Sequence, residues 1–559
     1  MNSVIILILG IIVYYLGIKV YAQYIDEKII KSDPKRATPA RMYADGVDFM
    51  PTPKNILFGY QFKSIAGAAP ILGPIIAIKW GWLPGLVWIL LGTLFIGWVQ
   101  DYTSAVVSIR NDGKTFGSIS YSLISPRART ILLFFIYLYL LLIAAAFTDI
   151  VAKFMSNNPS LPLSIIVLAL DGMLVGFMIY RSQFNLVVVT IIGLGLFYGA
   201  MILGNFIPIN FSDPSFNLIF WAIFALAFSF LGSILPIWSF VQPINYLGFF
   251  IIFIGMIGII FGIVVGHPNL SAPAITGFTV DNLPLWPMLF VTIACGATSG
   301  WHSIVSSTGT SRQLEKETDT RPVAGGAMFL EMILALLALI IVSINTTKVP
   351  PPVLFGNGMG DILHYLGLPV EWGKAYGPVM IVILAITILH LVIRFMRIAT
   401  NELAGKAFPL LKNQIAGTMF ALILTFILVY TGTFNYIWVL FGSANQLMAS
   451  LALLICSIWL VSQKKPSYFT FYPMIFMYVT TMVALIITDY QLLKQAINRI
   501  DLAGKPLALN SILGNWFAGI IGITLFISAV ILAYDGIKAF IRYRKELFIK
   551  IEEKPNVSL

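Results

Sequence analysis

The chain is divided into apolar segments long enough to cross a membrane, and this pattern limits its fold more than any other feature. A hydrocarbon core about 30 Å thick requires about 20 apolar residues of helix, and about fifteen such segments lie in the chain. With 58% hydrophobic and 11% charged residues, the chain is far more apolar than a soluble domain. We therefore expect an all-α polytopic membrane protein, with residues 1–559 forming one transmembrane transporter domain. The predicted spans lie near 3–22, 62–80, 83–107, 131–152, 161–180, 184–206, 217–236, 244–266, 286–308, 324–345, 376–396, 413–431, 438–461, 469–488 and 511–536.

The distribution of basic residues predicts the orientation of these spans. Of the 35 Lys and Arg, about 25 lie in loops after odd-numbered spans and about 7 in loops after even-numbered spans. Because cytoplasmic loops carry the excess of positive charge, we expect the N-terminus outside and the C-terminus inside, with a cytoplasmic basic tail at 537–559. The net charge of +11 then reflects topology beside membrane lipid and gives no indication of nucleic-acid binding.

Helix breakers interrupt some of these predicted spans. The stretch FKSIAGAAPILGPII (62–76) places two glycines and two prolines inside the span 62–80, and FLGSILPIWSFVQP interrupts a second segment, 217–243. Unpaired backbone groups are tolerated in a membrane only around a cavity or a ligand, and interrupted helices in oppositely directed halves mark a transporter's central site. The alternative is that the glycines permit close helix packing and the prolines are kinks. The candidate substrate-binding residues are Ala66, Gly67, Ala68, Ala69, Pro70, Gly73, Pro74, Gly232, Ser233 and Pro236.

A third interrupted segment, 286–310, is the candidate coupling-ion helix, with the sequence ACGATSGWHSIVSSTGTS. Its Thr298, Ser299 and Ser303 hydroxyls, together with carbonyls freed at the breaks, suit a cation. His302 titrates in the range that suits a proton gradient, although a histidine bonded to a loose carbonyl is the simpler alternative. The coupling ion is therefore expected to be a proton or, alternatively, sodium.

Ionisable residues inside predicted spans are costly and are therefore functional candidates. Asp101 and Glu331 are candidate proton-handling or gating acids, and an interfacial structural role is the alternative for Asp101. On one face of the segment 376–396, His390 is a further coupling candidate, and Arg394 can clamp a carboxylate in a bidentate manner. The alternative for Arg394 is a side chain that reaches out to the membrane interface.

Several functional classes lack support in the sequence. It contains no Walker-type loop, no GxGxxG after a strand, no HExxH and no CxxC. Cys295 and Cys456 lie in hydrophobic segments and are expected to be packing residues, so we expect no resident metal or cofactor and no enzyme activity. A channel, a membrane sensor and a membrane enzyme remain alternatives. A channel requires a ring of pore residues, a sensor requires a signalling domain or partner, and an enzyme requires an acid–base pair, for which His390 and Glu402 are too far apart in helical periodicity.

Three long runs resemble the carbon starvation protein A family: DPKRATPARMYADGVDFMPTPKNILFGYQFKSIAGAAPILGPIIAIKWGWLPGLVWILLG (33–92), PMLFVTIACGATSGWHSIVSSTGTSRQL (287–314) and FGSANQLMASLALL (441–454). The resemblance implies a secondary transporter of the bacterial inner membrane, within the amino acid-polyamine-organocation superfamily and its LeuT-type inverted-repeat fold. It also implies import of peptides or of pyruvate, the latter with protons, during nutrient limitation. Pyruvate, amino acids and peptides are thus the expected small-molecule substrates.

The chain departs from the family pattern at positions that bear on proton coupling. Gly59-Tyr60-Gln61-Phe62 stands where relatives typically read G-H-H-F, and Gln100-Asp101 stands for H-D. In TILHLVIRFMR, His390 replaces the usual acid. The resemblance therefore leaves open the choice between proton and sodium, the substrate and the oligomeric state.

Overall fold

Helices account for most of the structure, a computed structural model that describes residues 1–45, 49–345, 349, 351–404, 407–430, 437–501 and 504–552. In this part of the chain twelve helices are long and apolar enough to cross a membrane, and a bent pair makes thirteen. The only sheet within these residues is a two-stranded antiparallel hairpin of β1 (Thr279–Val280) and β2 (Leu283–Pro284). The all-α polytopic fold expected from the sequence is confirmed.

Ten of the predicted spans form two sets of five with matching packing. The first set comprises α3 (Lys54–Ile65) with α4 (Ala69–Ala77), α5 (Trp82–Gly92) with α6 (Trp98–Ile109), α8 (Pro126–Asn157), α11 (Pro214–Ile234) and α12 (Val241–Gly266). The second comprises α13 (Leu285–Thr292) with α14 (Gly300–Ile304), α15 (Gly326–Ile344), α17 (Val370–Ala404), α18 (Gln414–Tyr430) and α19 (Ile437–Ser462).

The two sets repeat each other's contacts. Helix α12 packs on α3 and α17, as α19 packs on α14 and α8. Helix α11 packs on α8 and α17, as α18 packs on α17 and α8, and α8 and α17 pack on each other at the centre. Because six spans, an even number, lie between α3/α4 and α13/α14, the two interrupted helices and their sets run in opposite directions. This is the inverted repeat of a LeuT-type transporter.

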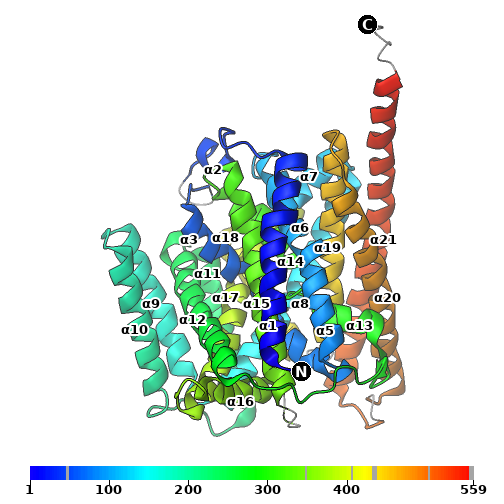
Figure 1. The fold of residues 1–559 in the computed structure, drawn as a ribbon. Coiled ribbons are helices and arrows are strands. Elements are labelled where there is room, and N and C mark those ends of the chain that lie inside the picture. The colour runs from blue at the N-terminus through cyan, green and yellow to red at the C-terminus, as the bar shows by residue number, and fades with distance from the viewer. Residues whose placement is uncertain are drawn as a thin grey trace.

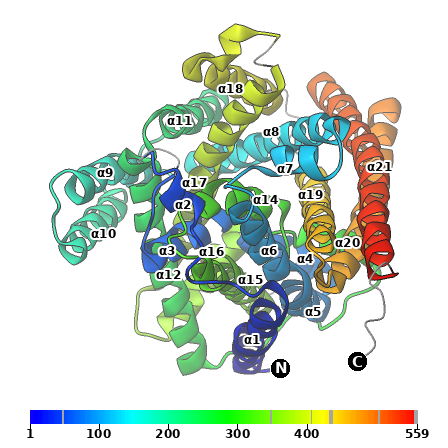
Figure 2. The ribbon, with the colours of Figure 1, turned by 90° about the horizontal axis from the view of Figure 1, so that it is seen from above.

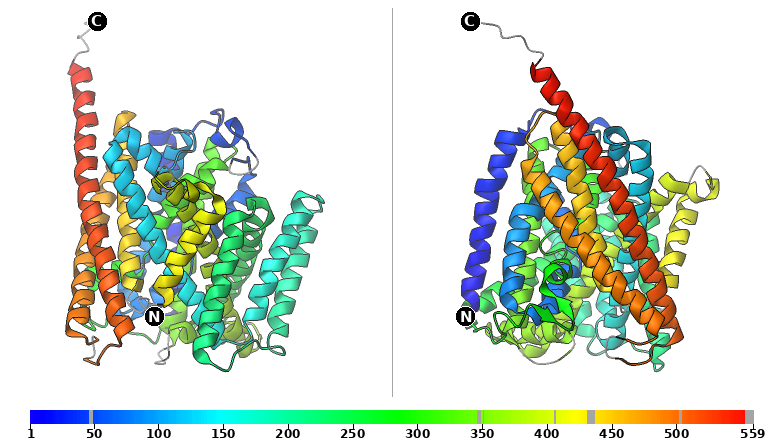
Figure 3. Two further views of the ribbon diagram at one scale, coloured as in Figure 1. Left: turned by 180° about the vertical axis from the view of Figure 1, so that it is seen from behind. Right: turned by 90° about the vertical axis from the view of Figure 1, so that its right-hand side faces the viewer.

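The remaining helices lie around this core, as Figures 1 and 2 show. The hairpin of α9 and α10 lies at one edge and the pair α20–α21 at another, while α1 covers a third side. Figure 3 shows α21 extending past the bundle, and the far end of α21 lies at the opposite end of the molecule from the N-terminus. The bounds of these elements are α1 (Ser3–Leu16, continued by π-helical turns to Ile30), α2 (Pro39–Met42), α7 (Phe116–Leu123), α9 (Pro162–Tyr180), α10 (Leu186–Leu203), α16 (Pro351–His364), α20 (Tyr468–Asn498) and α21 (Leu509–Glu552).

Local sequence explains where several of the long helices begin. Pro126 and Pro214 occupy first helical positions, where the missing N–H has no partner to lose. The preceding Ser125 and Asp213 accept hydrogen bonds from the N–H groups of Ala128 and Ser215. These caps fix the starts of α8 and α11, two helices of the central packing.

Two predicted segments differ from simple spans. Segment 286–308 is divided between α13 and α14, and segment 413–431 corresponds to α18, which has 17 residues. The segment 217–243 also differs from the broken helix expected there. Gly232 lies near the end of α11, Pro236 follows that end, and α12 begins a new helix at Val241. Pro236 therefore lies in the turn between two helices and Pro243 in the first turn of α12, where a missing N–H group is harmless.

Candidate transport site

The first interruption separates α3 from α4, with axes bent by 43°. Ala66 has extended backbone angles, and helix resumes at Ala69 with Pro70 in its first turn. The carbonyl of Ser64, near the end of α3, accepts a hydrogen bond from the indole N–H of Trp301 at 2.6 Å. The break predicted within 62–80 thus lies at Ala66–Ala68, and a side chain of α14 engages it.

The second interruption, Ile293–Ser299, separates α13 from α14. Side chains of neighbouring helices donate hydrogen bonds to carbonyls at its two ends. The Trp88 indole donates to Phe290 O and Ile293 O at 3.1 and 3.0 Å. The amide of Gln446 donates to Phe290 O at 2.8 Å, and that of Gln100 donates to Ser299 O at 2.6 Å. These carbonyls are consequently satisfied by the protein itself and are not directed at an ion.

Asn445 orders the beginning of α14. Its side-chain oxygen accepts from the hydroxyls of Tyr139 and Ser299 at 2.6 and 3.0 Å, and from the backbone N–H of Trp301 at 3.2 Å. Asn445 and Gln446 belong to the run FGSANQLMASLALL, which the sequence analysis used only as a family signature. In the structure, this run holds the second interruption in place.

The two interruptions are packed together, backbone against backbone. A Cβ added at Gly73 would lie 2.9 Å from Thr292 O and 3.2 Å from Ile293 Cα, so α4 approaches α13 where only glycine fits. A Cβ added at Gly296 would lie 3.7 Å from Pro70 Cα. The pair that meets at the centre is therefore α3/α4 with α13/α14. The sequence analysis had paired 62–80 with 217–243, and the α9–α10 hairpin, inserted within the first set between α8 and α11, accounts for the different spacing.

A cluster of three ionisable side chains lies beside these interruptions. His302 Nδ1 lies 3.1 Å from Asp101 Oδ2 and His302 Nε2 lies 3.2 Å from Glu331 Oε2, and all three side chains are fully buried. Asp101 comes from α6, His302 from α14 and Glu331 from α15. Among the described residues, Asp101 Oδ1 and both Glu331 oxygens have no hydrogen-bond partner. A histidine between two carboxylates can accept or release a proton without leaving an unpaired charge.

The sulfur of Cys295 lies beside His302 and Glu331 of this cluster. A thiol, an imidazole nitrogen and a carboxylate oxygen from Cys295, His302 and Glu331 lie within 4.8 Å of one another. Such a donor set is compatible with a transition metal. The Cys295 thiol, however, donates to the Ser299 hydroxyl at 3.4 Å, and the Asn445 amide donates to the sulfur at 3.4 Å.

The other coupling candidates lie near the cluster. The Thr298 hydroxyl donates to Gln100 Oε1 at 3.0 Å, and the Ser303 hydroxyl donates to Gly300 O within its own helix at 2.7 Å. Gln61, at a position where relatives typically carry histidine, donates to the Ser306 hydroxyl at 3.0 Å. Two of the three replaced histidine positions, Gln61 and Gln100, thus face the interrupted α13–α14 segment with side chains that do not titrate.

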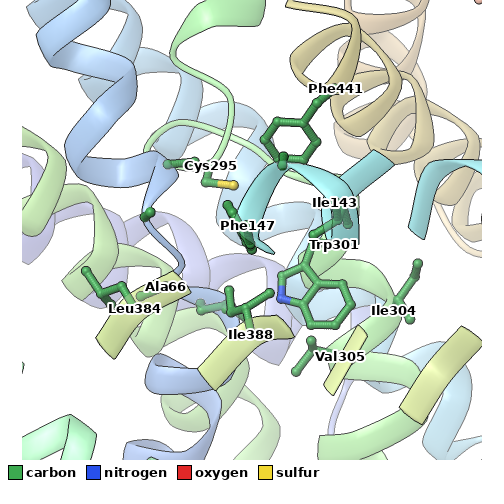
Figure 4. Packing of buried hydrophobic residues seen from close by; sticks show 14 of the residues in the cluster. Ala66, Ile143, Phe147, Cys295, Trp301, Ile304, Val305, Leu384, Ile388 and Phe441 are labelled. Carbon is green, nitrogen blue, oxygen red and sulfur yellow. The ribbon is translucent and has the colours of Figure 1, made fainter. Parts of the chain in front are cut away.

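The substrate candidates divide into two groups. Residues around the first break are buried, and Gly67 packs against Ile388 and Phe147, so an apolar cluster covers the amides expected to bind a substrate. Figure 4 shows this cluster around Ala66. Candidates of the second group lie apart from the interruptions, at the end of α11. This second group comprises Gly232, Ser233 and Pro236. The candidates Ala68, Ala69, Pro70, Gly73 and Pro74 belong to the first group.

Arg394 and His390 extend from α17 toward the end of α11. The Arg394 guanidinium donates to Leu235 O at 3.2 Å and approaches Gly232 O at 3.4 Å, and its side chain is nearly fully buried. It therefore caps the C-terminal carbonyls of α11 instead of reaching the membrane interface. His390 packs against Gly232 and lies between the rings of Phe228 and Phe240.

Inverted halves, two interrupted helices meeting between them and a buried ionisable cluster beside the meeting point define a secondary transporter. The chain belongs to the carbon starvation protein CstA family, whose model matches residues 2–349 and 343–484. It is 29% identical to the pyruvate/proton symporter BtsT of Escherichia coli K12, over 86% of this chain and 81% of that protein. It is 28% identical to the peptide transporter CstA of Bacillus subtilis 168, over 99% of both chains.

A solved structure supports the fold independently of these sequences. A mutant of the manganese transporter of Eremococcus coleocola superposes with a TM-score of 0.50 at 11% sequence identity, over 89% of this chain and 99% of that one. At this identity the likeness concerns the fold alone. The protein is thus a multi-pass membrane transporter for small molecules.

Proposed function

We propose that this protein imports a small carboxylate nutrient such as pyruvate together with protons, across the inner membrane of a bacterium. The observation that carries the proposal is the Asp101–His302–Glu331 cluster, buried between α6, α14 and α15. Three ionisable groups in contact with one another allow a proton to enter or leave without stranding a charge in the bilayer interior. The pyruvate/proton symporter among the relatives supports the substrate class.

Satisfied carbonyls favour a proton over sodium as the coupling ion. A sodium site requires oxygen atoms that are free to replace water around the ion. At the second interruption, Phe290 O, Ile293 O and Ser299 O instead accept hydrogen bonds from Trp88, Gln446 and Gln100. We place the N-terminus outside and the C-terminus inside on the distribution of basic residues.

Peptide uptake is the second candidate function. The Bacillus subtilis relative that covers 99% of both chains is named a peptide transporter. A dipeptide also carries a carboxylate, so both substrate classes use the same kind of positive recognition group. Competition between pyruvate and dialanine separates them.

The experiment is uptake by proteoliposomes containing the purified protein. Pyruvate uptake is expected to saturate and to increase as the external pH falls at constant sodium. Dialanine competing far better than pyruvate would transfer the assignment to peptides. A requirement for a sodium gradient at constant pH, or an absence of gradient-dependent uptake of either compound, would contradict the proposal.

A further inference from the structure

A lysine that the sequence analysis passed over lies at the centre of the bundle. Lys63 is in α3, three residues before the break at Ala66, and its side chain is completely buried. Its ammonium group donates a hydrogen bond to the hydroxyl of Thr387 on α17. Its Cε lies 3.2 Å from the position that a Cβ would take at Gly248 of α12. Burying an amino group at this depth is costly, so its presence calls for an explanation.

His390 lies one helical turn after Thr387 on the same face of α17. The imidazole is completely buried, and neither ring nitrogen has a hydrogen-bond partner among the described residues. Arg394 follows His390 one turn further along α17. Arg394 donates to Leu235 O at the end of α11, whereas His390 keeps both ring nitrogens without a partner in the described part of the chain, one turn from the Thr387 hydroxyl that Lys63 engages.

Helix α12 adds two amide side chains to this space. Asn245 lies one turn before Gly248, the residue that Lys63 touches, and Gln242 lies one turn before Asn245. Both side chains are buried, and in the described part of the chain neither the oxygen nor the nitrogen of either amide has a partner. Because α3, α12 and α17 pack on one another, these groups belong to one region of the interior.

Unpartnered polar groups are rare in protein interiors because each one costs free energy, and several together indicate a missing ligand. In the described part of the chain, the groups here supply an ammonium bonded to Thr387, together with an imidazole and two amides that have no partner. Such a set offers positive charge and N–H donors, which match a carboxylate. We propose that Lys63, His390, Asn245 and Gln242 bind the carboxylate group of the substrate.

This inference rests on the proposed function, because it takes the ligand to be the transported substrate. It adds to that function the side chains that recognise the carboxylate of the substrate. It places the carboxylate on side chains of α3, α12 and α17 instead of on the amides of Gly67–Gly73. Pyruvate and the C-terminus of a peptide are the two sources of that group.

The test is equilibrium binding of radiolabelled pyruvate to the purified full-length protein, without any gradient. The competitors are unlabelled pyruvate, dialanine and methyl pyruvate, in which the charge is removed. Lys63→Met is expected to weaken pyruvate binding at least tenfold, and methionine of similar length is expected to pack in its place. Lys494→Met, a change at an exposed lysine whose ammonium lies over the ring of Tyr490, is the matched control.

His390→Asp provides a second variant, in case Lys63→Met fails to fold by gel filtration. An aspartate there would pair with Lys63 and compete with the ligand, so a similar loss of affinity is expected. Stronger competition by dialanine than by pyruvate would support the site and would identify the C-terminus of a peptide as the carboxylate that it binds. Pyruvate affinity within twofold of the parent in both folded variants, equal competition by methyl pyruvate, or no binding to the parent would overturn the inference. Lysine-dependent binding without gradient-driven uptake would overturn only the proposed function.

Discussion

Three buried ionisable side chains of the candidate transport site lie against one another. Glu331 touches His302, and Asp101 touches the opposite ring nitrogen. The sequence singled out all three residues because each is an ionisable group in an apolar segment, but it could not show that they meet. They lie on three helices from both halves of the repeat, and only the packing of the halves brings them together.

Replacing Glu331 with glutamine is expected to separate exchange from accumulation. Glutamine resembles the protonated acid and cannot release a proton, so Glu331→Gln should lose pH-driven pyruvate accumulation by at least tenfold while keeping pyruvate–pyruvate exchange. Uptake and counterflow in proteoliposomes measure both quantities. Glu371→Gln, at an exposed glutamate paired with Lys374, is the control. Undiminished accumulation by Glu331→Gln would remove this acid from the coupling mechanism.

Metal removal tests the other chemistry that this cluster permits. Both ring nitrogens of His302 already face carboxylates, so we expect treatment with a chelator to leave pyruvate uptake unchanged. The measurement is uptake before and after dialysis against EDTA, with added zinc and manganese in parallel samples. A loss of uptake that one of these metals restores would show that Cys295, His302 and Glu331 hold an ion.

A second buried acid serves stability. Glu317 is fully buried, and its carboxylate lies 2.6 Å from Arg110 Nε and 3.4 Å from Arg36 Nε. Glu317→Gln leaves Arg110, itself nearly buried, without its counter-charge and is expected to cost about 3 kcal/mol or more. Glu315→Gln, in an exposed pair with Arg41, should cost less than about 1 kcal/mol. Thermal unfolding in detergent compares the two, and equal melting temperatures would contradict this reading.

At the scale of elements, the sequence showed where helices break but not which breaks meet. Gly67 to Pro74 and the segment 286–310 were recognised because glycine and proline are costly in a membrane helix. The third candidate, 217–243, carries the same residues at an ordinary turn, and composition alone does not separate a turn from a break. Lys63 was missed for a related reason, since one lysine near the end of a predicted span reads as an interfacial residue.

The approach of α4 to α13 gives a prediction at this scale. A methyl group at Gly73 would meet Thr292 O at 2.9 Å, and a backbone carbonyl cannot rotate away as a side chain can. Gly73→Ala should therefore separate the two interruptions and lower the uptake rate at least tenfold. Gly199→Ala on α10, where an added Cβ meets nothing within 4 Å, should leave uptake unchanged. Similar uptake by the two variants would mean that the close approach is not required.

At the scale of the molecule, hydropathy predicted the helical class and most of the spans. The symmetry was harder to predict, because α9 and α10 are inserted within the first half, between α8 and α11, and shift the spacing of equivalent helices. Equivalent helices of the two halves have corresponding packing partners but do not have matching sequences. Packing partners are visible only in three dimensions. The resemblance to relatives supplied the fold family, while the arrangement of the halves came from the structure.

The opposite positions of the N-terminus and the far end of α21 give a prediction for the whole molecule (Figures 1 and 3). Green fluorescent protein fused after residue 559 should fluoresce, since it matures in the cytoplasm, and an epitope before Met1 should be reached by antibody on spheroplasts. The reversed fusions provide the control. Both reporters on one side of the membrane would contradict the arrangement of the helices.

The contact of Gly73 with Thr292 also joins the two halves mechanically. Each interruption is the point where its own half can bend. At Gly73 and Thr292 the two halves are in contact backbone to backbone, with no side chain between them. A displacement of α4 must therefore push α13 directly, so neither half can respond to a ligand alone. We expect a small molecule bound between Gly73 and Thr292 to block the movement of both halves at once, so an inhibitor would need to bind at this contact alone.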